Sequence, residues 1–291
     1  MATPKPDPRY RLVVFDSIDI EEEAPAVRDL FCKVTGLHPT DAMLWIARAP
    51  AVWSTPLNAA QTRELLDGLY ELKVAAEAWA VDNFPDLNPV RTIHDAACLP
   101  EGFRVKGLHG EPIHWVPWNK VEMICAGKIA AEDEYQAPSP PRWPSAIATG
   151  IRALTLRKPI PSDRRARAPR VPREPVGEVI VVRKDPRIAF RVIETQMNYA
   201  YLGEKLSSSA AKNFPNFLAD LVARADDAYL TPSTRAMIGH DDPVEFTFPT
   251  SQSLVDYALH RLLWSWYKRD SEAARDRPSR RVDDIEETRM E

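Results

Sequence analysis

The histidine and cysteine side chains are the groups in this sequence that could bind a metal ion or attack a substrate. His109 and His114 lie five residues apart across an expected hairpin, which could bring two imidazoles together. A zinc site needs further ligands, and none lies near this pair, so a solvated turn histidine is the simpler interpretation. Cys125 lies in an apolar strand pattern, which favours an inert core thiol over a nucleophile.

Sequence motifs of catalysis are absent from the chain. It has no phosphate-binding glycine loop, no nucleophile elbow and no paired-cysteine spacing for zinc. Asp241 and Asp242 precede Pro243, where turn formation explains the acidic pair. We therefore predict a protein that is not an enzyme, with no catalytic residue, no cofactor and no metal.

Aromatic residues give the candidate interaction surface. Tyr199, Tyr201 and Glu204 fall in an expected loop, and aromatic residues in loops favour recognition. The alternative for the tyrosines is packing against the core, with the hydroxyl bonded to the backbone. Trp264 and Trp266 lie on the last expected helix and would mark a partner site if they are exposed. The expected partner is another protein.

Length and composition exclude several classes of protein. The 291 residues suffice for about two domains, and 44% hydrophobic residues exclude global disorder. The 38 basic against 42 acidic residues argue against a nucleic-acid binder along the whole chain. No stretch approaches the roughly 20 apolar residues of a membrane helix, and residues 1–10 lack the apolar core of a secretory signal. Together with three cysteines that show no paired spacing, this predicts a cytoplasmic protein that does not contact a membrane.

The first part of the chain is expected to form a strand followed by three helices. An apolar run at 11–15 predicts a buried strand. A helix is expected from about 25 to 34, closed by Gly36, because glycine favours the left-handed conformation of a helix end. A second helix is expected over 40–48, and Asn58 is expected to cap a third.

A resemblance to a known family lies in this part. The segment 35–42, Thr-Gly-Leu-His-Pro-Thr-Asp-Ala, and the closing Ala49-Pro50 resemble the signature of the C-terminal domain of the bacterial ribosomal stalk protein. The match runs without gaps from about 27 to 72, and the same compact fold resembles that of the ClpS adaptor, which hands substrates to a Clp protease. The resemblance implies a small α/β sandwich over 8–88, with helices on one face of a three-stranded sheet. Its third strand would fall at 74–79, where alanine-rich sequence leaves a strand and an extended helix both open.

Departures from the family bear on function. The stalk family recruits elongation factors with basic residues, and the corresponding positions here are Ala24, Asp29, Cys32 and Met43. Residues 1–88 also contain 14 acidic against 8 basic side chains. Such a surface would lose the electrostatic steering of those encounters. The Asn-Asp pair of the adaptor's acidic pocket is also missing. We therefore expect a shared fold with a different partner.

The rest of the chain is expected to be rich in β-strands. Residues 90–245 are expected to form a split-barrel-like domain, interrupted by a disordered Pro/Arg linker at 137–175. Asn213 is expected to cap a helix with Pro215 in its first turn. The expected strands and hairpin turns fall at 103–106, 107–111, 113–116, 121–125, 178–182, 184–186 and 188–193.

A last helix from Ser253 to Arg269 is apolar around much of its circumference, so it needs cover on more than one side. We expect 250–270 to dock within the chain, pairing with a second copy being the alternative, and 271–291 to be a disordered tail. The fold class is therefore α+β. The predicted function is a non-enzymatic protein-interaction or adaptor protein, with a nucleic-acid-associated regulator acting through the basic linker as the alternative.

Overall fold

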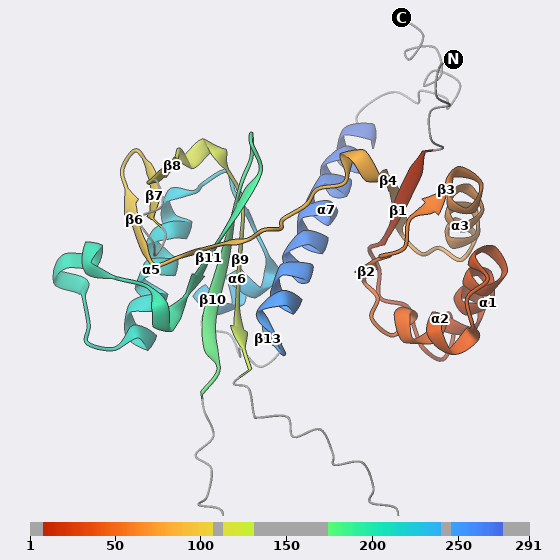
Figure 1. Cartoon of the computed structure of the whole chain (residues 1–291), viewed down its shortest axis with the longest axis horizontal. Helices are drawn as coiled ribbons and strands as arrows, with labels where there is room; N and C mark the ends of the chain where they lie inside the picture. The colour runs from red at the N-terminus through yellow and green to blue at the C-terminus, as the bar shows by residue number, and fades with distance from the viewer. Residues whose placement is uncertain (1–7, 107–112, 131–173, 240–245, 276–291) are drawn as a thin grey trace, which may run out of the picture.

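The α+β class is confirmed by a computed structural model, which describes residues 8–106, 113–130, 174–239 and 246–275 (Figure 1). The expected turn at 107–111 with His109, nearly all of the expected linker, and Asp241-Asp242 lie outside the described residues. Within these ranges, four short 3-10 helices accompany the longer elements: η1 Val81–Asn83, η2 Trp118–Lys120, η3 Glu194–Gln196 and η4 Ala200–Lys205.

The N-terminal part is built on a central strand, β1 (Arg9–Val14). One edge of β1 pairs with β4 (Ala76–Ala80), and the other pairs with β2 (Ala51–Val52) and β3 (Leu57–Asn58), all antiparallel. The two short strands thus act as one interrupted edge strand. The alanine-rich stretch that could have extended a helix is the strand β4, because five of its residues find partners along β1. Backbone pairing of this kind outweighs alanine's helix propensity.

Three helices, α1 (Ala24–Thr35), α2 (Pro39–Ile46) and α3 (Ala59–Glu71), pack on one face of this sheet. Gly36 closes α1 with φ 73°, as expected. The Asn58 side chain accepts from the backbone N–H of Gln61, as expected for the cap of α3. The core beneath the helices contains Leu12, Val14, Val27, Phe31, Leu65 and Leu69.

Strands of the second part pair in two sheets. The large sheet has the order β12-β9-β10-β11-β5, and β13 also pairs with β9; the small sheet has the order β6-β7-β8. In the described part of the chain, β10 and β11 pair with strands of the large sheet. The bounds are β5 Arg91–Ile93, β6 Asp95–Leu99, β7 Gly102–Lys106, β8 His114–Val116, β9 Val121–Ile129, β10 Val176–Arg183, β11 Ile188–Ile193, β12 Tyr229–Leu230 and β13 Thr247–Phe248.

The large sheet buries both of its faces. Alternate residues of a strand point to opposite faces, so Ile124 and Val181 pack toward α5 (Ala210–Arg224), whereas Met123 and Ile180 pack toward α7 (Ser251–Arg275). The small sheet shares the core on the α5 side. A further helix, α6 (Pro232–Gly239), follows β12.

The start of α5 corrects an expectation. The helix begins at Ala210, so Asn213 is a buried residue inside it and not its cap, and Pro215 also lies inside the helix. The Asn213 side chain accepts from the backbone N–H of Ser207 at 2.7 Å and donates to the Ser207 carbonyl oxygen at 2.8 Å. The Asn213 side-chain amide therefore fixes the backbone of the loop that precedes α5.

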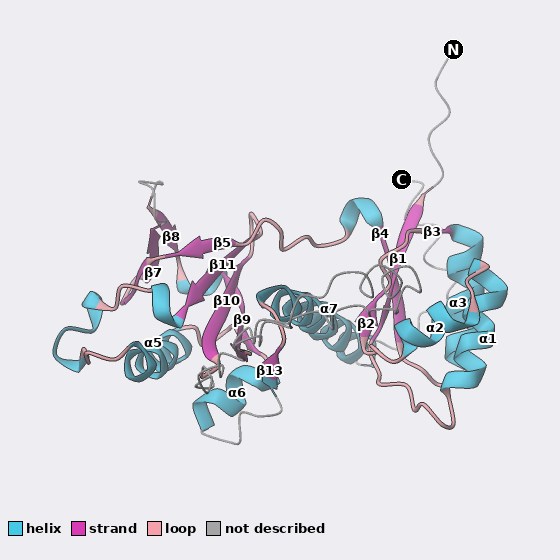
Figure 2. Ribbon diagram, turned by 60° about the horizontal axis from the view of Figure 1, so that its bottom comes forward, coloured by secondary structure: helices cyan, strands magenta, loops and turns pink. Residues whose placement is uncertain are grey.

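Helix α7 lies between the large sheet and the N-terminal part (Figures 1 and 2). It begins at Ser251, two residues before the expected start, because Thr250 is its cap: the Thr250 Oγ1 accepts from the backbone N–H of Ser253 at 3.1 Å. It continues to Arg275, so residues 271–275, expected in a disordered tail, are helical.

The two sides of α7 bury different apolar residues. Leu254, Ala258 and Leu262 pack on the large sheet. Leu263 packs with Val13 and Phe15 of the N-terminal part. None of the helices in the described ranges is long and apolar enough to cross a membrane.

Candidate functional site

A stripe of aromatic and basic residues runs along α7 between its two buried sides. Tyr257, Arg261, Trp264 and Lys268 follow the four- and three-residue spacing that brings side chains to one side of a helix. The Arg261 Cζ lies 5.3 Å from the ring centroid of Tyr257 and 5.9 Å from that of Trp264. The Lys268 Nζ lies 5.1 Å from the Trp264 centroid. These four residues, the α7 stripe, thus alternate rings with cations that stack on them.

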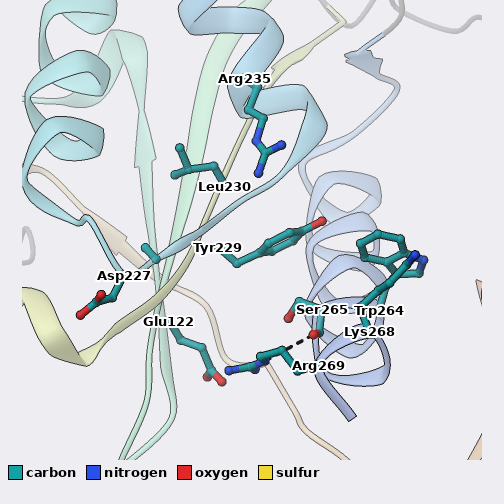
Figure 3. A pocket seen from close by; sticks show the side chains of 10 residues that line it. Glu122, Asp227, Tyr229, Leu230, Arg235, Trp264, Ser265, Lys268 and Arg269 are labelled. Carbon is teal, nitrogen blue, oxygen red and sulfur yellow. Dashed lines mark hydrogen bonds between the residues drawn. The ribbon is translucent and has the colours of Figure 1, made fainter. Parts of the chain in front are cut away.

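One end of the stripe borders a cavity of about 350 Å³, the Trp264 cavity (Figure 3). Across it from Trp264, Tyr229 of β12 points its hydroxyl toward the indole, and Arg235 of α6 lies beyond the tyrosine. Burial raises the pKa of Tyr229 above its ordinary value. A neutral phenol and an indole therefore face each other, with cations on either side.

Cations are in excess around the Trp264 cavity. Arg235, Lys268 and Arg269 form no ion pair with any other residue in the described part of the chain. Two acidic residues, Glu122 and Asp227, also line the cavity, so three cations face two carboxylates. The Glu122 carboxylate already accepts from the Trp266 Nε1 at 2.9 Å and lies 3.6 Å from the Arg187 Nε. A cavity lined in this way attracts negatively charged ligands.

The other end of the stripe borders a larger cavity of about 590 Å³, the junction cavity, between α7 and the N-terminal part. Arg11 of β1, Arg48 after α2, and Arg261 of α7 line it, together with the ring of Trp45. Among the described residues of this lining, Asp256 is the acidic one, and its Oδ1 accepts from the Gln252 side chain at 2.9 Å. Where the structure describes the chain, none of the three arginines has an ion pair.

His260 holds the two walls of the junction cavity together. Its side chain is 4% exposed, and its Nε2 lies 3.1 Å from the carbonyl oxygen of Val14, so this nitrogen carries the proton and donates. Burial lowers the pKa of His260 to about 4, so the imidazole is neutral at pH 7. The residue positions α7 against β1 and adds no charge to the cavity.

The expected loop surface lies elsewhere. Tyr199 is 5% exposed, and its hydroxyl donates to the Glu194 carbonyl oxygen at 2.9 Å, which matches the alternative of a core tyrosine. The half-buried Tyr201 has its hydroxyl 3.4 Å from the Asp220 carboxylate, and Glu204 is exposed. The two tyrosines pack into the core on the α5 face of the large sheet, opposite the face that α7 covers.

The two expected tryptophans of α7 have different surroundings. Trp264 belongs to the α7 stripe. The Trp266 ring packs instead against Trp79, with centroids 5.5 Å apart, and Arg187 stacks over it at 4.7 Å. Trp266 therefore belongs to the contact between the two parts of the chain.

Several residues of the cavities were not expected from the sequence. The spacing of Tyr257, Arg261 and Lys268 around Trp264 was a usable signal. No sequence signal pointed to Arg48 or Arg235, because these residues reach the cavities from elements that are far from α7 in the chain.

The side chains first considered for chemistry are placed as follows. Burial raises the pKa of the Cys98 and Cys125 thiols to about 12, so both are protonated at pH 7. His114 Nε2 lies 2.8 Å from a guanidinium nitrogen of Arg91. Within the residues that the structure describes, no group of three or more His, Cys, Asp or Glu could hold a metal ion.

Comparison of the chain with protein-family models, with curated proteins and with solved structures gives no match. The resemblance of 8–88 to the stalk domain therefore stays a prediction from its sequence motif.

Proposed function

We propose that the protein is a non-enzymatic protein-interaction or adaptor protein, and that the α7 stripe and its two cavities bind an acidic segment of another protein. The observation that carries this proposal is the set of cations along the stripe that form no ion pair with a described residue. The chain as a whole, by contrast, has a net charge of −4. This set of cations would steer an acidic partner toward the stripe.

The residue types support recognition of a protein. Tyrosine, tryptophan and arginine are the residues that most often dominate protein interfaces, and all three types occur in the α7 stripe. The N-terminal part supplies Trp45 and Arg48 to the junction cavity. An adaptor-like role for this part agrees with its resemblance to the stalk and ClpS folds. We also propose a cytoplasmic location, since the three cysteines are free thiols.

Fluorescence anisotropy with labelled acidic peptides tests the proposal. Lys268→Gln and Arg235→Gln should each weaken binding several-fold, and affinity should fall as salt is raised. Lys212→Gln is the matched control, because Lys212 is an exposed cation on α5, on the other side of the large sheet. Equal effects of the three substitutions would refute a binding site at the stripe.

The alternation of rings and cations also favours a second candidate, a nucleic-acid-associated regulator. Single-strand binders combine basic grooves with aromatic side chains on which bases stack. The basic linker first considered for this role lies almost wholly outside the described residues. A single-stranded oligonucleotide that binds more tightly than an acidic peptide of equal charge, and depends on Trp264, would favour this candidate.

A further inference from the structure

Hydrogen-bond donors without acceptors are concentrated around the junction cavity. Among the described residues, eight side-chain nitrogen or oxygen atoms are covered and have no hydrogen-bond partner. Four of them belong to residues that line this one cavity: Arg11 Nε, Trp45 Nε1, the Tyr257 hydroxyl and Arg261 Nε. All four can donate. Covered polar groups are normally paired, so this concentration points to a ligand that is rich in acceptors.

The charge of the lining narrows the class of ligand. Three arginines face one aspartate, a net charge of +2, and the Asp256 carboxylate is already engaged by Gln252. The arginines come from three separate elements, so the course of a single helix does not explain their meeting. Like charges that share a cavity repel one another, unless an anion lies between them.

A phosphoryl group fits these requirements better than a carboxylate. It carries about 1.5 to 2 negative charges at pH 7 and three strong acceptor oxygens. Guanidinium groups match its geometry with paired hydrogen bonds. A carboxylate has one charge and two oxygens, which would leave part of the positive charge unmatched.

We propose that the junction cavity binds a phosphoryl group carried by the partner's acidic segment, so that the protein recognises a phosphorylated partner. This inference rests on the proposed function and names its ligand class. The volume of about 590 Å³ leaves room for the side chain that bears the phosphoryl group, beside the rings of Trp45 and Tyr257. The four donors are covered by neighbouring atoms, and the Arg11 and Arg261 guanidinium groups lie over the rings of Phe84 and Tyr257. Binding of the anion therefore requires these two side chains to turn toward it.

Isothermal titration of the full chain with matched peptides tests the inference. One acidic peptide is used in four forms, with serine, glutamate, phosphoserine or phosphotyrosine at a central position. At least one phosphorylated form should bind about ten-fold more tightly than the glutamate form, as expected for added charge-assisted hydrogen bonds. Inorganic phosphate should compete with it.

Two variants assign the effect to the cavity. Arg48→Gln should remove the preference for the phosphorylated peptide over the glutamate form, whereas Lys268→Gln should weaken all four forms and keep the preference. Arg48 is exposed, so its substitution is compatible with folding, which circular dichroism checks. Arg63→Gln, on the exposed side of α3, is the control and should change nothing.

The outcomes separate this inference from the proposed function. Equal binding of the glutamate and phosphorylated peptides would overturn the inference and leave the proposed function standing. Arg48-dependent binding of phosphate or of a nucleoside monophosphate, with no affinity for any peptide, would support the ligand class and overturn the proposed function. No binding of any of these probes would overturn both.

Discussion

His260 should make the stability of the protein depend on pH. Its pKa falls from an ordinary value of 6.5 to about 4 in the native protein. At pH 7 the imidazole is neutral both in the native and in the unfolded chain, so it adds nothing to the pH dependence. Between pH 6.5 and 4 the unfolded chain binds a proton that the native protein does not, and the free energy of unfolding must fall.

The magnitude follows from the two pKa values. Each pKa unit corresponds to about 1.4 kcal/mol, so the fall from 6.5 to about 4 should remove about 3 kcal/mol of stability by pH 4. The surroundings of the His260 side chain explain its low pKa. The Val14 carbonyl accepts from Nε2, Phe15 lies 5.8 Å from the imidazole, and the charge of Arg261 opposes a second positive charge.

Urea unfolding followed by far-UV circular dichroism, at intervals from pH 7 to pH 4, measures this loss. His260→Gln is the comparison, because glutamine can still donate to Val14 and does not titrate. The comparison is needed since burial raises the pKa of Glu77 and Glu178, which changes stability in the opposite direction as pH falls. Parallel curves for the wild type and the variant would refute the assignment of a neutral, buried imidazole.

Three further expectations follow from packing, burial and charge. Leu263→Ala should lower the free energy of unfolding, measured with urea, by about 2–5 kcal/mol, because the side chain is fully buried between the two parts of the chain. Leu44→Ala, at a residue that is 59% exposed, is the control and should have little effect in the same assay. In native protein at pH 8, mass spectrometry should find Cys32 alkylated well before Cys98 and Cys125, whose buried thiols have pKa values near 12; equal rates would contradict the burial. The protein should not replace the ribosomal stalk in stimulating GTP hydrolysis by elongation factors, because none of the four corresponding positions is basic, and stimulation equal to that of a stalk protein would contradict this.

Local features of the fold could be predicted from the sequence because they depend on a few neighbouring residues. Gly36 closes α1 in the left-handed conformation, and Asn58 caps α3 together with Gln61. The strands at 178–182 and 188–193 pair around a short turn, as expected. Each of these features is decided within a few residues of chain.

Features that depend on distant contacts could not be predicted. The stretch at 74–79 has a helical composition, yet residues 76–80 form a strand because they pair along the edge of β1. Asn213 resembles a helix cap in the sequence, but in the structure its side chain forms hydrogen bonds with the backbone of Ser207. The candidate site has the same origin: Trp264 is visible in a helical pattern, but its cavities need walls from separate elements.

The position of α7 in the chain has a consequence for synthesis. The helix covers Val13 and Phe15, which are translated long before the helix itself. Until α7 emerges from the ribosome, this face of β1 and the Met123 face of the large sheet have no cover from it. Surfaces of this kind make nascent chains prone to association. Chaperones should therefore bind nascent chains arrested before residue 250 more than those that include α7, and a chain cut at that point should aggregate during expression.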